Sequence, residues 1–93
     1  GWIQLGKRKY YLDPKKNGAR ATGWRRIEGY RYYFSKKKGY MLTGYQVDPA
    51  GEAFLLCPVK GSDEGKCMIT DARGVLRIAE EYDMANRRYV FNW

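Results

Sequence analysis

The stretch WRRIEGYRYYFSKKKGYMLTG, residues 24–44, repeats the pattern of WIQLGKRKYYLDPKKNGARATG, residues 2–23. Each stretch begins with Trp, places a Gly before an aromatic pair that an apolar residue follows, and ends on Thr-Gly. A third copy begins at Tyr45, and the triplets that open with an aromatic residue start at residues 10, 32 and 54. The same interval occurs twice, which indicates one supersecondary unit used several times.

Each copy predicts a β-hairpin. A short strand follows the opening aromatic residue, a turn lies at the Gly, and a second strand alternates its aromatic side chains across two faces. One hairpin buries too little apolar surface to be stable in water, whereas stacked neighbours bury it jointly. The predicted fold is therefore all-β, a solenoid of stacked β-hairpin repeats. We expect strands near residues 2–5, 9–12, 24–27, 31–34, 53–57 and 67–70.

The copies differ in length, and this sets the domain organisation. We expect residues 1–93 to form one repeat domain of a larger protein, with an insertion in the third copy at residues 57–74. The last copy is partial and has Asn86 in the place of the turn Gly, a residue that tolerates positive φ. Residues 75–88 also fit one face of a helix, and this alternative stays open. The expected copies are residues 2–23, 24–44, 45–78 and 79–93.

This pattern resembles that of the cell-wall-binding repeats of Gram-positive surface proteins, a family that includes choline-binding and glucan-binding branches. The resemblance is most specific over residues 1–45. It implies a left-handed hairpin solenoid in a secreted or cell-surface protein, where the repeats attach the protein to wall polymers or glycans. The residues that carry it are Trp2, Tyr10-Tyr11-Leu12, Thr22-Gly23-Trp24, Tyr32-Tyr33-Phe34 and Thr43-Gly44-Tyr45.

The residue before each Tyr pair disfavours choline as the ligand. In the choline-binding branch, the resemblance implies a Trp at this position, which helps to enclose a quaternary ammonium through cation–π attraction. Here Lys9 and Arg31 stand there and would repel a cation. The alternative is that the aromatic residues are simply core. The candidate ligand-binding residues are Trp2, Lys9, Tyr11, Trp24, Arg31, Tyr33 and Tyr45.

The charge distribution points to an anionic partner. Residues 1–43 hold twelve Lys and Arg but two acidic residues, whereas residues 44–93 hold six basic and eight acidic residues. A field of one sign favours a polyanion. Arg side chains can grip phosphate or carboxylate while aromatic rings stack on sugars. We therefore expect a non-catalytic module that anchors a surface protein through a teichoic acid-like polymer or a glycan such as a glucan.

Other functional classes fit less well. The chain has no His, and it contains no nucleophile elbow, P-loop or metal-ligand spacing, so we expect no enzymatic activity, metal or cofactor. No apolar run is long enough to span a membrane. Two alternatives stay open, which are an adhesion module that presents residues 57–74 to a protein partner and a nucleic-acid binder.

Two cysteines flank the turn-rich segment of the insertion. Cys57 and Cys67 lie on the two expected strands of a hairpin, and an exported protein meets an oxidising environment. We expect the two residues to face each other across the hairpin and to form a disulfide. The alternative is a pair of reduced thiols.

Overall fold

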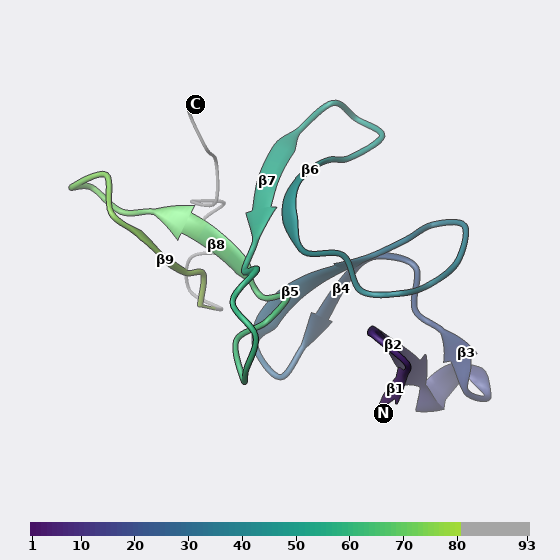
Figure 1. Cartoon of the computed structure of the whole chain (residues 1–93). Coiled ribbons are helices and arrows are strands. Elements are labelled where there is room, and N and C mark those ends of the chain that lie inside the picture. Colours follow the sequence, from purple (N-terminus) through teal and green to yellow (C-terminus); the bar gives the residue numbers. More distant parts are fainter. Residues whose placement is uncertain (81–93) are drawn as a thin grey trace.

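The computed structural model describes residues 1–80, and these residues form β-strands joined by tight turns (Figure 1). The all-β fold is confirmed, and among the described residues no helix is long and apolar enough to cross a membrane. The strands are β1 (Trp2–Leu5), β2 (Arg8–Asp13), β3 (Ala19–Arg20), β4 (Gly23–Ile27), β5 (Tyr30–Phe34), β6 (Gly44–Val47), β7 (Ala53–Leu56), β8 (Cys67–Thr70) and β9 (Leu76–Ile78), with a short 3₁₀ turn η1 at Pro14–Lys16.

The strands form three antiparallel sheets in the order β1-β2-β3, β4-β5 and β6-β7-β8-β9. The pairing register reproduces the sequence repeat. Trp2 lies opposite Tyr11 in the first hairpin and Trp24 opposite Tyr33 in the second. Tyr45 lies opposite Leu55 in the third hairpin, which is the equivalent pair. The three copies are therefore built alike, with the opening aromatic residue facing the second residue of the triplet.

All six expected strands are present, each within one residue of its expected bounds. Three further strands, β3, β6 and β9, were not among them. β3 and β9 have only two and three residues, whereas β6 has four and is the first strand of the third hairpin. β9 pairs with β8, so the helical alternative is wrong over Leu76–Ile78. The rest of that segment from residue 81, and most of the partial fourth copy, lie outside the described residues.

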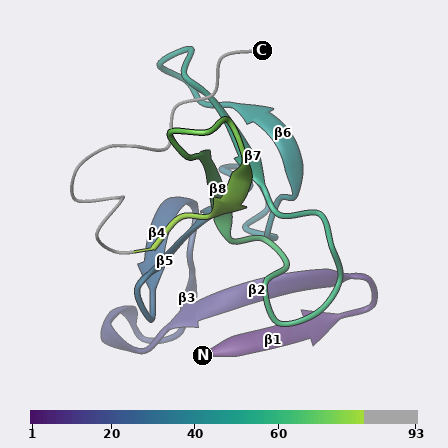
Figure 2. The same ribbon diagram turned by 90° about the vertical axis from the view of Figure 1, so that its left-hand side faces the viewer.

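The hairpins follow one another through the molecule (Figures 1 and 2). The opening Trp of the first copy packs on the second copy, and that of the second copy packs on the third. The Trp2 ring lies 5.0 Å from Tyr32 and 5.8 Å from Phe34 between ring centroids. The Trp24 ring lies 4.3 Å from Phe54. These contacts bury the aromatic strands that a single hairpin would expose. The two core clusters are Ala21, Ile27, Tyr32 and Phe34, and Tyr33, Phe54, Leu56 and Cys67.

The turn between β4 and β5 explains why a Gly stands before the second strand. Ile27 pairs with Tyr30, so the loop has only two residues, Glu28 and Gly29. Both have positive φ, 52° and 85°, as a type I′ turn requires. This turn matches the right-handed twist of the flanking strands, and Gly adopts the second position without steric cost.

The insertion is part of the fold. β8 pairs with β7, and β9 pairs with β8, so the third hairpin grows into a four-stranded sheet. Cys67 and Ile69 of β8 are almost fully buried. The segment between β7 and β8 returns toward the first hairpin and contacts it, as described below.

The disulfide expected between Cys57 and Cys67 is wrong, since both cysteines are free thiols. Cys67 pairs with Leu56, and the next pair toward the turn joins Cys57 to Lys66, whose C=O accepts the Cys57 N–H at 2.8 Å. Directly opposed residues point to the same face of a sheet, and successive residues point to opposite faces. A register offset of one residue therefore sends the two thiols to opposite faces.

Both thiols are expected to resist Ellman's reagent in the native protein at pH 8 and to react fully after unfolding in guanidinium chloride. Both side chains are buried, and burial raises the pKa of the Cys67 thiol to about 12, so that little of the reactive thiolate forms. Alkylation in denaturant without reductant, followed by mass measurement, checks this result. If the unfolded protein carried no alkyl label, this prediction would be contradicted and the two cysteines would be linked by a disulfide.

Candidate functional site

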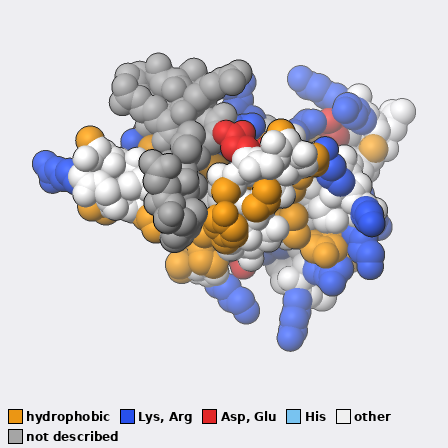
Figure 3. Space-filling view, turned by 90° about the horizontal axis from the view of Figure 1, so that it is seen from above, with side chains coloured by type: hydrophobic (Ala, Val, Ile, Leu, Met, Phe, Trp, Pro, Cys, Tyr) orange, Lys and Arg blue, Asp and Glu red, His pale blue; other side chains and the backbone are white. Residues whose placement is uncertain are grey.

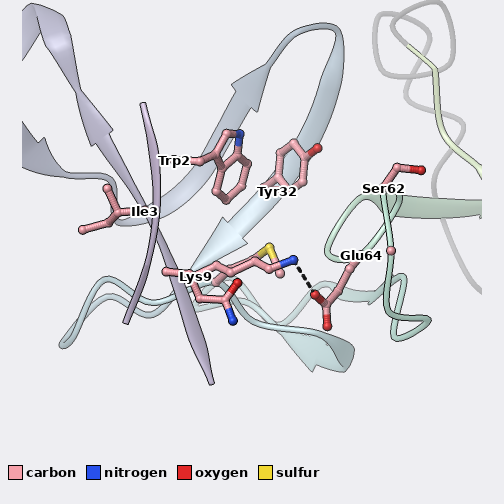
Figure 4. A pocket seen from close by; sticks show the side chains of 9 residues that line it. Trp2, Ile3, Lys9, Tyr32, Ser62 and Glu64 are labelled. Carbon is pink, nitrogen blue, oxygen red and sulfur yellow. Dashed lines mark hydrogen bonds and ion pairs between the residues drawn. The ribbon is translucent and has the colours of Figure 1, made fainter. Parts of the chain in front are cut away.

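A pocket of about 370 Å³ lies where the first hairpin, the second hairpin and the insertion meet (Figure 4). Trp2 and Tyr32 form its aromatic wall, and Lys9 of β2 extends beneath them toward Glu64. We call it the Trp2 pocket. Trp2 is 41% exposed, which leaves part of its indole available to a ligand. The other residues that line it are Ile3, Gln4, Met41, Gly61 and Ser62.

Lys9 is neutralised inside this pocket. Its Nζ lies 2.8 Å from Glu64 Oε1, and both side chains are partly buried, with 33% and 17% of their surface exposed. Lys9 therefore brings no unbalanced positive charge to the pocket, because the insertion supplies the opposite charge. The pair occupies space beside the two rings and ties the insertion to the first hairpin.

The second site is an open groove of about 580 Å³ around Trp24, which we call the Trp24 groove. Trp24 packs edge-to-face on Tyr33, with 5.0 Å between ring centroids. The guanidinium carbon of Arg31 lies 4.1 Å from the centroid of the Trp24 ring. This is the cation–π geometry, with the cation supplied by the chain itself. Thr22, Gly23, Lys36, Asp48, Pro49 and Ala50 complete the groove.

The structure thus groups most of the predicted site residues in two places. Tyr11 packs edge-to-face on Trp2 at 5.5 Å, and Tyr33 is 6% exposed, with its phenol pKa raised by burial. Both side chains therefore take part in packing, and their contact with a ligand stays a prediction. Tyr45 is 53% exposed on β6 and lines neither the Trp2 pocket nor the Trp24 groove.

Several residues of these sites were not predicted. Tyr32 had a visible signal, because it opens the triplet of the second copy and so follows the period. Glu64 had none, since it reaches its site from the insertion, and Asp48 had none, since it lies in the turn of the third hairpin, whose sequence differs from the turns of the first two.

Asp13 is a structural carboxylate at the end of β2. It is 2% exposed and accepts a hydrogen bond from the Lys15 N–H at 2.9 Å. Its other oxygen lies 2.8 Å from Arg25 Nη1. The Lys15 N–H and then Arg25 hold the pKa of this carboxyl below its ordinary value of 3.8, so it is ionised at neutral pH. The ion pair between Arg25 and Asp13 therefore joins β4 to the start of η1.

The chain matches known proteins over the repeats. Residues 1–15 and 22–41 match a family model described as "Putative cell wall binding repeat". A search of curated protein sequences gives no match. The fold is similar to that of CbpJ from Streptococcus pneumoniae, with a TM-score of 0.61 and 32% identity over 77% of this chain.

Two further solved structures share the fold. CbpF, solved in complex with ipratropium, has a TM-score of 0.59 and 28% identity over 76% of this chain. The modular Cpl-1 endolysin, solved with a peptidoglycan analogue, has a TM-score of 0.53 and 24% identity over 86% of this chain. This chain spans only about a quarter of each relative, namely 23% of CbpJ, 21% of CbpF and 25% of Cpl-1.

Proposed function

The N-terminal repeats of this chain belong to the cell wall binding repeat family, and on that premise we propose that the chain is a non-catalytic module that attaches a surface protein to the wall. Its ligand is an anionic wall polymer or a glycan, and choline is not its ligand. The module is one repeat domain, and its place of action is the surface of a Gram-positive bacterium. The charge of residues 1–43, twelve basic against two acidic residues, supports an anionic ligand.

The observation that carries this proposal is the position of Arg31 on Trp24. A quaternary ammonium needs the face of an aromatic ring, and the Arg31 guanidinium already covers that face at 4.1 Å. A ligand cation would have to displace it and then remain beside a like charge. At the equivalent position of the first copy, Lys9 stands where the resemblance implies an aromatic wall, and it is paired with Glu64 of the insertion.

The packing of the insertion favours wall binding over presentation of residues 57–74 to a protein partner. Glu64 contacts Lys9 of the first hairpin, and Cys67 lies in the core. A segment that the repeat stack holds on both sides is not a free loop that could be presented to a protein partner. The insertion instead shapes the Trp2 pocket, which it lines with Gly61, Ser62 and Glu64.

Co-sedimentation with purified Gram-positive walls tests the function. We expect the protein to sediment with native walls. We expect it to stay in the supernatant with walls stripped of anionic polymer by hydrofluoric acid, because these walls lack the negative charges that its basic side chains bind. Sodium chloride should release it, and choline chloride should release no more than sodium chloride at equal ionic strength. Extra release by choline would contradict the ligand class. Failure to bind either kind of wall would overturn the function.

A pair of variants tests the role of the two basic residues. Lys9→Trp with Arg31→Trp should create choline-dependent thermal stabilisation that the natural chain lacks, because each change removes a cation and adds an aromatic wall. Lys7→Trp with Lys37→Trp is the matched control, since both residues are exposed and lie outside the two sites. Stabilisation of the natural chain by choline would show that the interpretation of these positions is wrong.

A further inference from the structure

The outer face of the first sheet carries two arginines and two tyrosines in contact. Arg8 and Tyr10 share one face of β2, because residues two apart on a strand point the same way. Tyr40 forms an antiparallel bridge with Tyr10, and Arg20 pairs with Leu12, two residues further along the same face. We call Arg8, Tyr10, Arg20 and Tyr40 the Arg–Tyr face. It lies opposite the face of β2 that packs Tyr11 on Trp2.

Each arginine stacks on one of the tyrosines. The guanidinium carbon of Arg8 lies 4.0 Å from the Tyr40 ring centroid, and that of Arg20 lies 4.9 Å from the Tyr10 ring centroid. Arg20 Nη1 also donates a hydrogen bond to the Lys38 C=O at 3.3 Å. Directly opposed residues have Cβ atoms about 5 Å apart, so the two stacks adjoin. The guanidinium groups are thus held in place before any ligand arrives.

The charge of this face is not neutralised within the described chain. Other basic residues of the described chain do have acidic partners: Lys9 pairs with Glu64, Arg25 with Asp13 and Lys66 with Asp63. Among residues 1–80, neither Arg8 nor Arg20 is paired with a carboxylate. Both side chains are exposed, and Lys and Arg side chains gather at the end of the molecule that holds β1–β3 (Figure 3).

We propose that the Arg–Tyr face binds the phosphodiester chain of an anionic wall polymer, an inference that rests on the proposed function. A guanidinium stacked on a ring still directs its N–H groups outward in the plane of the fork, where two of them match two phosphate oxygens. Arg20 gives one of its five N–H groups to the Lys38 C=O and keeps the others for a ligand. Two such edges side by side suit neighbouring phosphates of one chain. The Trp24 groove suits phosphates less, because the acidic side chain of Asp48 lines it, and in the Trp2 pocket Lys9 is bound to Glu64.

Binding of a short synthetic poly(glycerol phosphate) chain, measured by calorimetry at two salt concentrations, tests the site. Arg8→Gln with Arg20→Gln should weaken binding by about tenfold or more, since hydrogen bonds to charged groups are the strong ones. The matched control is Lys15→Gln with Lys16→Gln, which removes the same charge from exposed residues of η1 and should cost less than about threefold. Arg8→Lys with Arg20→Lys should fall between wild type and the glutamine pair, because the charge stays and the planar fork is lost.

Equal losses in the glutamine pair and the control would overturn the site and leave only a general attraction of opposite charges. Tighter binding of a single-stranded thymidine oligonucleotide than of poly(glycerol phosphate) would overturn the assignment to a wall polymer. The wall co-sedimentation assay keeps the two proposals apart. If the glutamine pair binds walls as the natural chain does, the site is wrong while wall binding stands. Far-UV circular dichroism confirms that each variant is folded.

Discussion

Phe54→Ala is expected to lower the free energy of unfolding by about 3–5 kcal/mol, the usual cost of emptying a buried phenylalanine site. Phe54 is 1% exposed and packs against the rings of Trp24 at 4.3 Å and Tyr33 at 5.0 Å. Through these ring contacts, Phe54 packs the third hairpin against the second. For a domain of this size the loss corresponds to a fall in Tm on the order of 15–30 °C.

Thermal unfolding followed by circular dichroism checks this result, with Val59→Ala as the control. Val59 is 69% exposed in the insertion, so its truncation should change Tm by no more than a few degrees. A Phe54→Ala protein as stable as this control would mean that the second and third hairpins do not stack through the contacts of Phe54 with Trp24 and Tyr33. The repeat architecture derived from that contact would then be wrong.

Gly65→Ala should destabilise the protein by about 2–4 kcal/mol, from overpacking together with backbone strain. Gly65 has a φ of +86°, and an added Cβ would overlap Sδ of Met41 and come within 2.8 Å of its Cε. The backbone of Met41 is held, because its N–H donates to the Lys9 C=O at 2.7 Å and the residue bridges Phe34. The Met41 side chain would therefore have to leave its present conformation, or the insertion would have to shift.

Gly6→Ala separates the two causes. Gly6 has a comparable φ of +63°, but nothing lies within 4 Å of its added Cβ, so only backbone strain of about 1–2 kcal/mol is expected. Denaturant unfolding of both variants gives the difference. If the free energy of unfolding falls equally in the two variants, then the Cβ added at residue 65 does not meet Met41. The insertion would then not be docked on the first hairpin as described.

The repeat could be predicted because it depends on spacing alone. The interval between the aromatic triplets set the strand positions, and the register of each hairpin follows it, with Trp2 opposite Tyr11 and Trp24 opposite Tyr33. The turn Gly before the second triplet likewise follows from the need for positive φ at Gly29. These requirements involve residues close together in the sequence, so they can be predicted from one sequence alone.

The chemistry of the sites could be predicted only in part. Arg31 stacks on Trp24, a contact that the repeat spacing does not specify, and its effect on a ligand cation stays a prediction. Lys9 differs, since Glu64 lies 55 positions away and no repeat connects them. The arginines of the Arg–Tyr face were visible as basic residues, but nothing in their spacing paired Arg8 with Tyr40 or Arg20 with Tyr10.

The sequence by itself determined the all-β hairpin repeat, the strands within each copy and the excess of basic residues near the N-terminus, because these follow from local periodicity and composition. The tertiary structure decided which side chains meet: Glu64 with Lys9, Phe54 with Trp24, and Cys57 and Cys67 on opposite faces. A shift of one residue in register reverses the face of every side chain on a strand. Contacts between copies and across the insertion therefore depend on how the hairpins stack, which local patterns do not specify.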